Sequence, residues 1–186
     1  MKKSAQVLHK GFTLVELLVV IAIIAILAAV VVLIINPLEL TMRGRDAARL
    51  SDLMNLQNAI NVALQEGSAA AQQSPACNDN TATGVTCGPN RTYPSGANTR
   101  LTNGTGWVQI NFAGQSNVTV PTLPVDPTNN GAASTEYHYT YCGDGAKWII
   151  KARLESQQQR GKMSTDGDTD NNSYAVGSDM SLVCAY

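Results

Sequence analysis

One carboxylate, that of Glu16, stands inside a long apolar run and is the first candidate for chemistry in this chain. The run covers residues 12–35, and Glu16 is its only charged residue. As a helix it would extend about 36 Å, which is enough to cross a bilayer core of about 30 Å. A carboxylate in hydrocarbon costs a few kcal/mol unless it has a partner, so we interpret Glu16 as a functional residue.

A partner for Glu16 would arise if the chain were cut directly before Phe12. Residues 1–11 form a short basic leader with three lysines: Lys2, Lys3 and Lys10. Gly11 is a small residue at the border of the apolar run, where a protease facing the cytoplasm could cut. Cleavage there would create an α-amine on Phe12, one helical turn before Glu16. The alternative is a plain membrane anchor, since the run is too long for a removed secretory signal with its 7–15 apolar residues.

Residues 10–16, KGFTLVE, resemble the cleavage and methylation signal of type IV pilins and type II secretion pseudopilins. The likeness is close over roughly residues 1–65 and architectural beyond them. It implies that a prepilin peptidase cuts between Gly11 and Phe12 and that Phe12 is N-methylated. It also implies that Glu16 contacts the Phe12 amine of a neighbouring subunit in a homopolymeric filament. Assembly would then need an inner-membrane platform and its ATPase.

We expect three parts: the leader 1–11, a transmembrane and assembly helix 12–36, and an extracytoplasmic head 37–186. Pro37 and Gly44 should weaken the helix between them. The head should open with an amphipathic helix to about residue 66, stopped by Gly67. Its apolar side chains recur at three- and four-residue spacing: Leu53, Leu56, Ile60 and Leu64. We assign the intervening polar residues, including Asp46, Arg49 and Asp52, to other faces of the helix.

The rest of the head is predicted as a polar loop, 67–104, followed by a sheet and a C-terminal loop, 105–186. Alternating apolar residues predict a strand over 107–112, and a hairpin joins 137–141 to 148–154. Residues 118–125, with two prolines, should form an edge or a connector. The predicted fold class is α+β and pilin-like, with a long N-terminal helix packed on a small antiparallel sheet of three or four strands.

Four cysteines are present: Cys77, Cys87, Cys142 and Cys184. None forms a C-x-x-C pair, so the pattern does not favour zinc, and an even count in an exported domain favours two disulfides. Three pairings are open. We favour Cys77–Cys87, which closes a short polar loop, and Cys142–Cys184, which ties the C-terminus to a strand. The alternative is four reduced thiols.

Three carboxylates at alternate positions, Asp166, Asp168 and Asp170, could curl oxygen ligands around calcium, with Asp179 as a further ligand. The segment departs from an EF-hand loop because its sixth position is Asn171 and its twelfth is Gly177. The major pseudopilins of type II secretion have a calcium site in a similar C-terminal loop, so the resemblance favours calcium. The alternative is a solvated acidic turn.

Charge and motifs point away from two classes of function. The net charge of −1 becomes −4 once the three leader lysines are removed, which does not favour a nucleic-acid partner. The sequence contains none of the common catalytic motifs, and His138 is expected to lie half-exposed on a strand, so we predict no enzyme. The predicted function is a filament subunit, anchored in the inner membrane with its head outside the cytoplasm. The alternatives are a minor or competence-type pilin that binds DNA or a surface, and a membrane-anchored domain that never polymerises.

Overall fold

The computed structural model describes residues 11–67, 76–79, 100–117, 120–129, 137–144 and 147–182. The chain divides into two compact units, Met1–Leu40 and Thr41–Tyr186. The first unit contains the apolar helix. The second contains the sheet and most of the second helix, and it forms the head.

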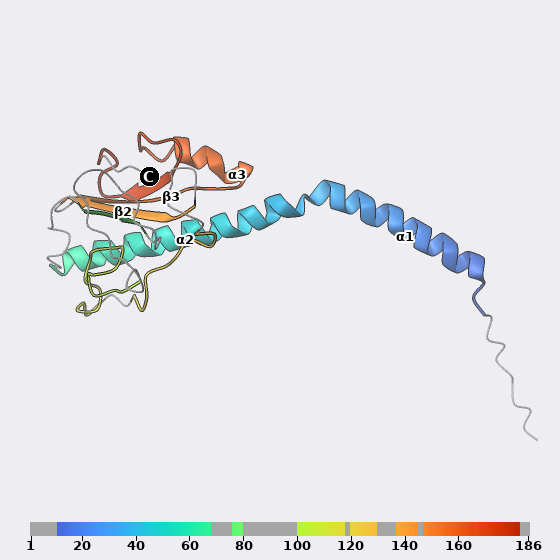
Figure 1. Cartoon of the computed structure of the whole chain (residues 1–186), viewed down its shortest axis with the longest axis horizontal. Helices are drawn as coiled ribbons and strands as arrows, with labels where there is room; N and C mark the ends of the chain where they lie inside the picture. The colour runs from blue at the N-terminus through green and yellow to red at the C-terminus, as the bar shows by residue number, and fades with distance from the viewer. Residues whose placement is uncertain are drawn as a thin grey trace, which may run out of the picture. The chain divides into compact units, whose positions relative to one another are not determined.

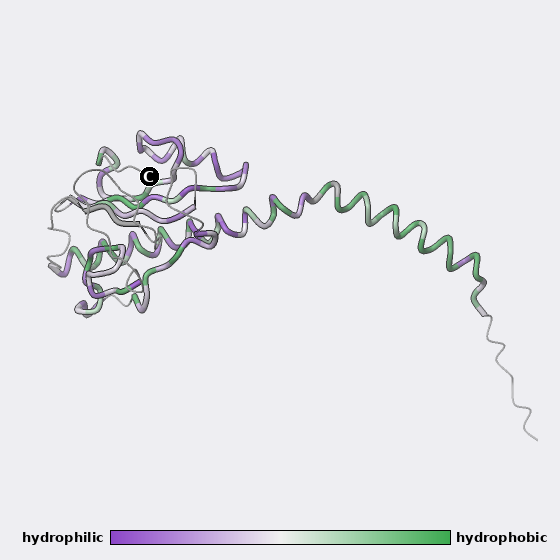
Figure 2. Tube along the Cα trace, viewed as in Figure 1, coloured by the Kyte–Doolittle hydropathy of each residue, from purple (hydrophilic) through white to green (hydrophobic). Residues whose placement is uncertain are grey.

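The apolar run forms helix α1, Leu14–Ile35. Its segment Leu14–Val32 is long and apolar enough to cross a membrane, and none of this segment is buried within the chain. Figure 2 shows that the hydrophobic colour follows the whole helix rather than one side of it. A helix that is apolar all round and uncovered needs lipid or other helices as its surroundings.

Helix α2, Pro37–Gln65, begins directly after a break at Asn36, which has a left-handed backbone with φ of 42°. Proline is well suited to the first position of a helix because its missing N–H has no partner there anyway. The backbone is broken at Asn36 and helical at Gly44, and the weakness that we expected between residues 36 and 44 stays a prediction. The helix stops where expected, since Gly67 has φ of 78° just after its last turn.

Among its described residues, the head contains a four-stranded antiparallel sheet in the order β1-β2-β3-β4. Its strands are β1 Ala76–Asp79, β2 Tyr139–Asp144, β3 Lys147–Ala152 and β4 Tyr174–Gly177. Two short helical segments, α3 Gln157–Arg160 and η3 Gly161–Ser164, lie between β3 and β4 in the sequence. Figure 1 shows α2 along one side of this sheet and α3 on the other. The predicted α+β, pilin-like fold class is therefore confirmed.

The expected hairpin is β2 and β3, but two further strands lie in segments that we predicted as loops. Strand β1 falls in the polar loop 67–104, and β4 falls in the C-terminal loop. Neither has a long apolar alternation, and each gains its hydrogen bonds by pairing with an edge of the hairpin. A Cβ on Gly177 would lie 2.3 Å from the carbonyl oxygen of Trp148, so glycine allows the close approach of β4.

The core lies between α2 and one face of the sheet, as the helical spacing predicted. The helix contributes Leu53, Leu56, Ile60 and Ala63, and the strands contribute Tyr139, Tyr141, Trp148, Ile150 and Ala152. Alternate strand residues face the other way because side chains in a strand have a period of two. A smaller cluster on that second face consists of Cys142, Ile149 and Ala175, with Met180 and Leu182 packed against it.

The predicted strand over residues 107–112 is wrong, although its side chains are buried. Trp107, Val108, Ile110 and Phe112 all belong to the core. The backbone forms bends and an isolated bridge, Asn103 with Asn111, and the Phe112 N–H donates to the Thr102 carbonyl at 2.7 Å. The alternation of apolar residues therefore reflects the burial of their side chains in a loop, and the segment is not a strand of the sheet. The described residues of 118–125 form no strand and act as a connector, which was one of the two expected forms.

Candidate functional site

Thr13 and Glu16 form a capping box at the start of α1. The Glu16 carboxylate accepts hydrogen bonds from the Thr13 backbone N–H at 2.9 Å and from the Thr13 hydroxyl at 2.6 Å. In return, the Glu16 N–H donates to the Thr13 hydroxyl oxygen at 3.3 Å. The sequence pattern T-x-x-E before an apolar run is the usual signal for this motif, but our prediction did not use it.

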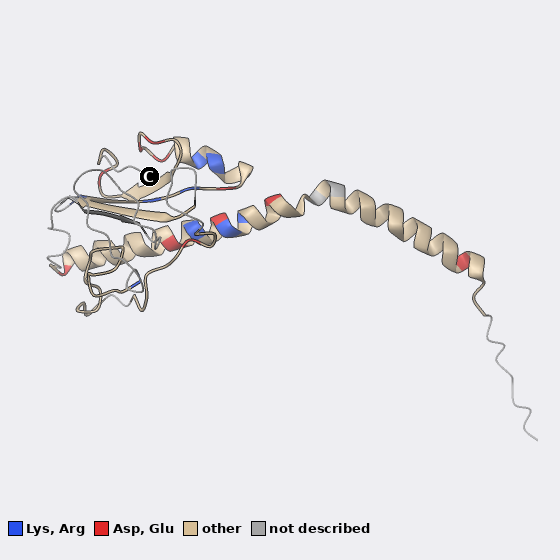
Figure 3. Cartoon of the chain, in the orientation of Figure 1, with Lys and Arg blue, Asp and Glu red and all other residues tan. Residues whose placement is uncertain are grey.

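The capping box gives Glu16 a polar partner within its own chain. It also fixes the carboxylate at the N-terminal end of the helix, where the helix dipole favours a negative charge. Of the described residues of α1, Glu16 is the only charged one, and Figure 3 shows charge on this helix only near its start. Among the described residues of α1, the Glu16 carboxylate is therefore the only charged group on an otherwise apolar helix.

The predicted processing residues precede the helix and are open. Gly11 has no atom within 4 Å of the place where a Cβ would stand, and Phe12 is 84% exposed. Both have non-helical backbone. This segment therefore has the accessible, unpaired geometry that a protease requires.

The head contains a charged group that we call the Arg49 cluster: Arg45, Asp46, Arg49, Asp126 and Glu155, all buried except the partly exposed Arg45. The Arg49 guanidinium makes two hydrogen bonds with the Asp126 carboxylate, at 2.7 and 2.8 Å. It also donates to Asp46 at 2.9 Å and lies 2.6 Å from Glu155. Arg49 and Asp46 are both 0% exposed. We had assigned these two residues to faces of the helix other than the apolar one; this is wrong, because they are buried together with Leu53, Leu56 and Ile60.

The Arg49 cluster joins α2 to two distant segments of the head. Asp46 accepts hydrogen bonds from the backbone N–H groups of Glu155 and Ser156, at 2.9 and 2.7 Å. Thr128 donates its hydroxyl to Glu155 at 3.0 Å. A buried charge is tolerated only when it is paired and hydrogen-bonded, and each member here satisfies that condition. The cluster therefore holds this part of α2, around Asp46 and Arg49, against the segments that contain Asp126 and Glu155.

Arg45 and Arg49 also set the protonation of Glu155. Burial by itself raises the pKa of Glu155, but the hydrogen bonds from the two arginines outweigh this effect and hold the pKa at about 2. Glu155 therefore remains a carboxylate over the ordinary pH range.

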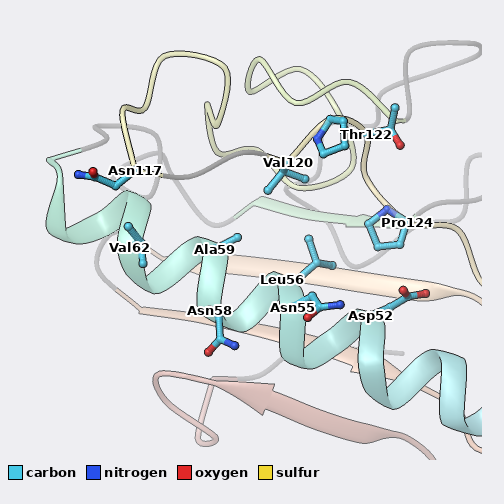
Figure 4. Close-up of a pocket in the computed structure, with 11 residues that line it drawn as sticks. Asp52, Asn55, Leu56, Asn58, Ala59, Val62, Asn117, Val120, Thr122 and Pro124 are labelled. Carbon is cyan, nitrogen blue, oxygen red and sulfur yellow. The ribbon is translucent and has the colours of Figure 1, made fainter.

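A groove of ≈ 520 Å³ lies between α2 and a second set of residues, Asn117 and those of 120–124 (Figure 4). Its polar lining includes Asp52, Asn55 and Asn117, and its apolar lining includes Leu56 and Val120. The Tyr139 hydroxyl donates to Asp52 at 2.8 Å. Burial raises the pKa of Asp52, although the hydrogen bond from Tyr139 lowers it in part. The groove has no convergent set of catalytic groups among its lining residues.

The four acidic residues predicted as calcium ligands do not converge. Asp168 pairs with the buried ammonium of Lys151, whereas Asp179 pairs with the exposed Lys147 at 2.8 Å. Among the described residues, no group of three His, Cys, Asp or Glu side chains is arranged to hold a metal ion. Calcium binding by this loop stays a prediction.

The cysteine pairing is only partly visible in the described residues. Cys142 is disulfide-bonded. Cys77 lies directly opposite Cys142 in the register of β1 and β2. Cys87 and Cys184 lie outside the described residues, so the favoured pairing stays a prediction.

His138, which we expected to be half-exposed, is buried with 2% of its surface accessible. It lies just before β2 in the sequence. Its burial gives a substrate no direct access to the imidazole.

Comparison with known proteins identifies one part of the chain. Residues 8–32 match the prokaryotic N-terminal methylation motif. The chain thus carries a prepilin cleavage and methylation signal of the kind typical of type IV pilins and type II secretion pseudopilins. No curated protein and no solved structure matches the chain. The recognised signal and the α+β, pilin-like architecture were both expected from the sequence.

Proposed function

We propose that this chain is a structural subunit of a type IV pilus or of a type II secretion-like pseudopilus, and that it polymerises through α1. One observation carries the proposal: Glu16 is the only charge among the described residues of a helix whose apolar side chains are exposed on every side. Such a helix is stable in lipid or inside a bundle of like helices. Proteins with this signal are typically structural rather than enzymatic.

The same features support a course for the chain from membrane to filament. A prepilin peptidase cuts between Gly11 and Phe12 and the new amine of Phe12 is methylated. The subunit waits in the inner membrane as a single-pass protein with its head outside the cytoplasm. An assembly platform and its ATPase then extract it into a surface or periplasmic filament, where Glu16 contacts the Phe12 amine of a neighbour.

The capping box refines the role of Glu16 in that course. In the isolated chain the carboxylate is held by Thr13, which offsets part of the cost of placing it in hydrocarbon. The amine of a neighbouring Phe12 adds an opposite charge, which Thr13 lacks. The charge pair therefore favours the filament and selects the axial register of the helices.

The test is a pair of matched variants, Glu16→Gln and Glu39→Gln. Glu16→Gln keeps the size of the side chain and deletes its charge, so it should lower the filament yield roughly tenfold or more, since a few kcal/mol are involved. Monomers should accumulate in the membrane, cleaved after Gly11 and with a folded head. Glu39→Gln makes the same change outside the apolar run and should assemble normally. Filament yield is measured on sheared surface fractions, and wild-type yield from Glu16→Gln would refute the assembly role.

The alternative is a minor or competence-type pilin whose head binds DNA or a surface. The charge of −4 without the leader lysines opposes binding to phosphates. The share of this chain among the subunits of isolated filaments separates the two functions, because a structural subunit is the main component and a minor pilin is not.

A further inference from the structure

Lys151 occupies an unusual place for a lysine, at the centre of the sheet. It lies on β3, directly between Thr140 of β2 and Ala175 of β4 in the strand register. Its residue neighbours on β3, Ile150 and Ala152, belong to the core beside α2, so Lys151 faces the other side of the sheet. It is nevertheless 1% exposed. A buried ammonium at such a position requires an opposite charge at short range.

The opposite charge comes from the acidic loop after η3. The Lys151 ammonium lies 2.5 Å from the Asp168 carboxylate, which is also buried, with 2% of its side chain exposed. A second carboxylate, that of Asp170, lies 4.0 Å away. The lysine and the loop thus form one ionic group on the second face of the sheet, buried at Lys151 and Asp168 and partly exposed at Asp170.

The remaining carboxylate oxygens of the loop already have donors within the chain. The two oxygens of Asp166 accept the backbone N–H groups of Asp168, at 3.1 Å, and Ala175, at 2.8 Å. The second oxygen of Asp168 accepts the N–H of Thr169. Asp170 accepts the N–H of Asn172 and the hydroxyl of Ser173. All six oxygens are therefore engaged by hydrogen bonds or by the ammonium.

Calcium would have to compete with this arrangement. The ion needs six to eight oxygen ligands, most of them free to turn toward one centre. Here the oxygens point to separate donors, and a divalent cation beside the Lys151 ammonium would be repelled by it.

We propose that Lys151 is the resident cation of the acidic loop and holds residues 166–170 against the sheet, so that the loop keeps its structure without a divalent ion. The proposal does not depend on filament assembly. It makes the opposite prediction to the calcium site inferred from the D-x-D-x-D spacing. It also assigns a role to Lys151, for which the sequence pattern of the strand predicts no function.

The first measurement uses the unmodified full-length chain in detergent. Its melting temperature, followed by tryptophan fluorescence, should be the same in millimolar CaCl₂ and in EDTA. A rise of several degrees with calcium, reversed by EDTA, would overturn the proposal, because a ligand that binds only the folded state raises the melting temperature.

The second measurement compares Lys151→Met with Lys147→Met. Lys151→Met leaves Asp168 buried without its partner and should lower the melting temperature by roughly 10 °C. Lys147 lies on the same strand but is 60% exposed in its pair with Asp179, so Lys147→Met should cost little. Equal losses in the two variants would contradict the proposal.

A double variant tests the pairing itself and guards against a chain that fails to fold. Adding Asp168→Asn to Lys151→Met removes the unpaired carboxylate, so the double variant should melt at a higher temperature than Lys151→Met alone. If Asp168→Asn lowers the melting temperature as much in the Lys151→Met background as in the wild type, the two residues are not coupled and the proposal fails.

Discussion

The guanidinium of Arg49 holds the carboxylate of Asp126 through two parallel hydrogen bonds, although the residues are 77 positions apart in the chain. Both side chains are 0% exposed. The pair, together with Asp46 and Glu155, locks the start of the head helix to two distant segments.

Replacing Arg49 should therefore destabilise the head strongly. Arg49→Met leaves Asp46, Asp126 and Glu155 without their shared cation, and breaking a buried ion pair costs about 3–5 kcal/mol. Arg160→Met, on the exposed end of α3, should change stability by less than about 0.5 kcal/mol. Urea unfolding of the full chain in detergent measures both. Similar stability losses in the two variants would show that the Arg49 cluster contributes little.

The stability of the head should fall in acid because of Glu155. Its folded pKa of about 2 lies below the unfolded value of 4.5, so it stabilises the folded state above pH 4.5. That contribution is lost as the pH falls from about 4.5 to about 2. Glu155→Gln should reduce the loss of stability over this interval, measured by urea unfolding at several pH values. An unchanged pH profile in the variant would exclude Glu155 as a source of the acid sensitivity.

Processing predicts a defined mature N-terminus. Intact-mass analysis of membrane-derived protein should show a chain that begins at Phe12 and carries one methyl group. The predicted site of cleavage is open at Gly11, so Gly11→Ala should be tolerated. The bulky side chain of Gly11→Trp should block cleavage, because the peptidase must fit closely around the backbone before Phe12. A chain that retains Met1 in cells with an active peptidase would contradict the processing signal.

Peptide mapping without reduction should resolve the disulfides. We predict Cys77–Cys87 and Cys142–Cys184, each stabilising the head by about 2–4 kcal/mol. The register of β1 and β2 offers a specific competitor, Cys77–Cys142, since directly opposite residues in antiparallel strands lie about 4.5–5.5 Å apart. Recovery of that cross-strand peptide would refute the favoured pairing. Four alkylatable thiols in exported protein would refute disulfides altogether.

The sequence predicted three features from patterns of neighbouring residues: the N-terminal signal, the apolar face of α2 and one hairpin. The apolar run, the basic leader and Glu16 marked the N-terminal signal, and the spacing from Leu53 to Leu64 marked the face of α2 that packs on the sheet. Alternation located the hairpin of β2 and β3. It misplaced residues 107–112, because a buried loop and a strand can share the same apolar pattern.

Only the tertiary structure decided which charges are buried. We had assigned Asp46 and Arg49 to faces of the helix other than the apolar one, and we had made no prediction for Lys151. Whether a charge is buried depends on the partners that can neutralise it, and these lie on other elements: Asp126 and Glu155 for Arg49, and Asp168 for Lys151. A one-dimensional pattern contains no information on those contacts, because the free energy that permits burial arises only when the partners meet.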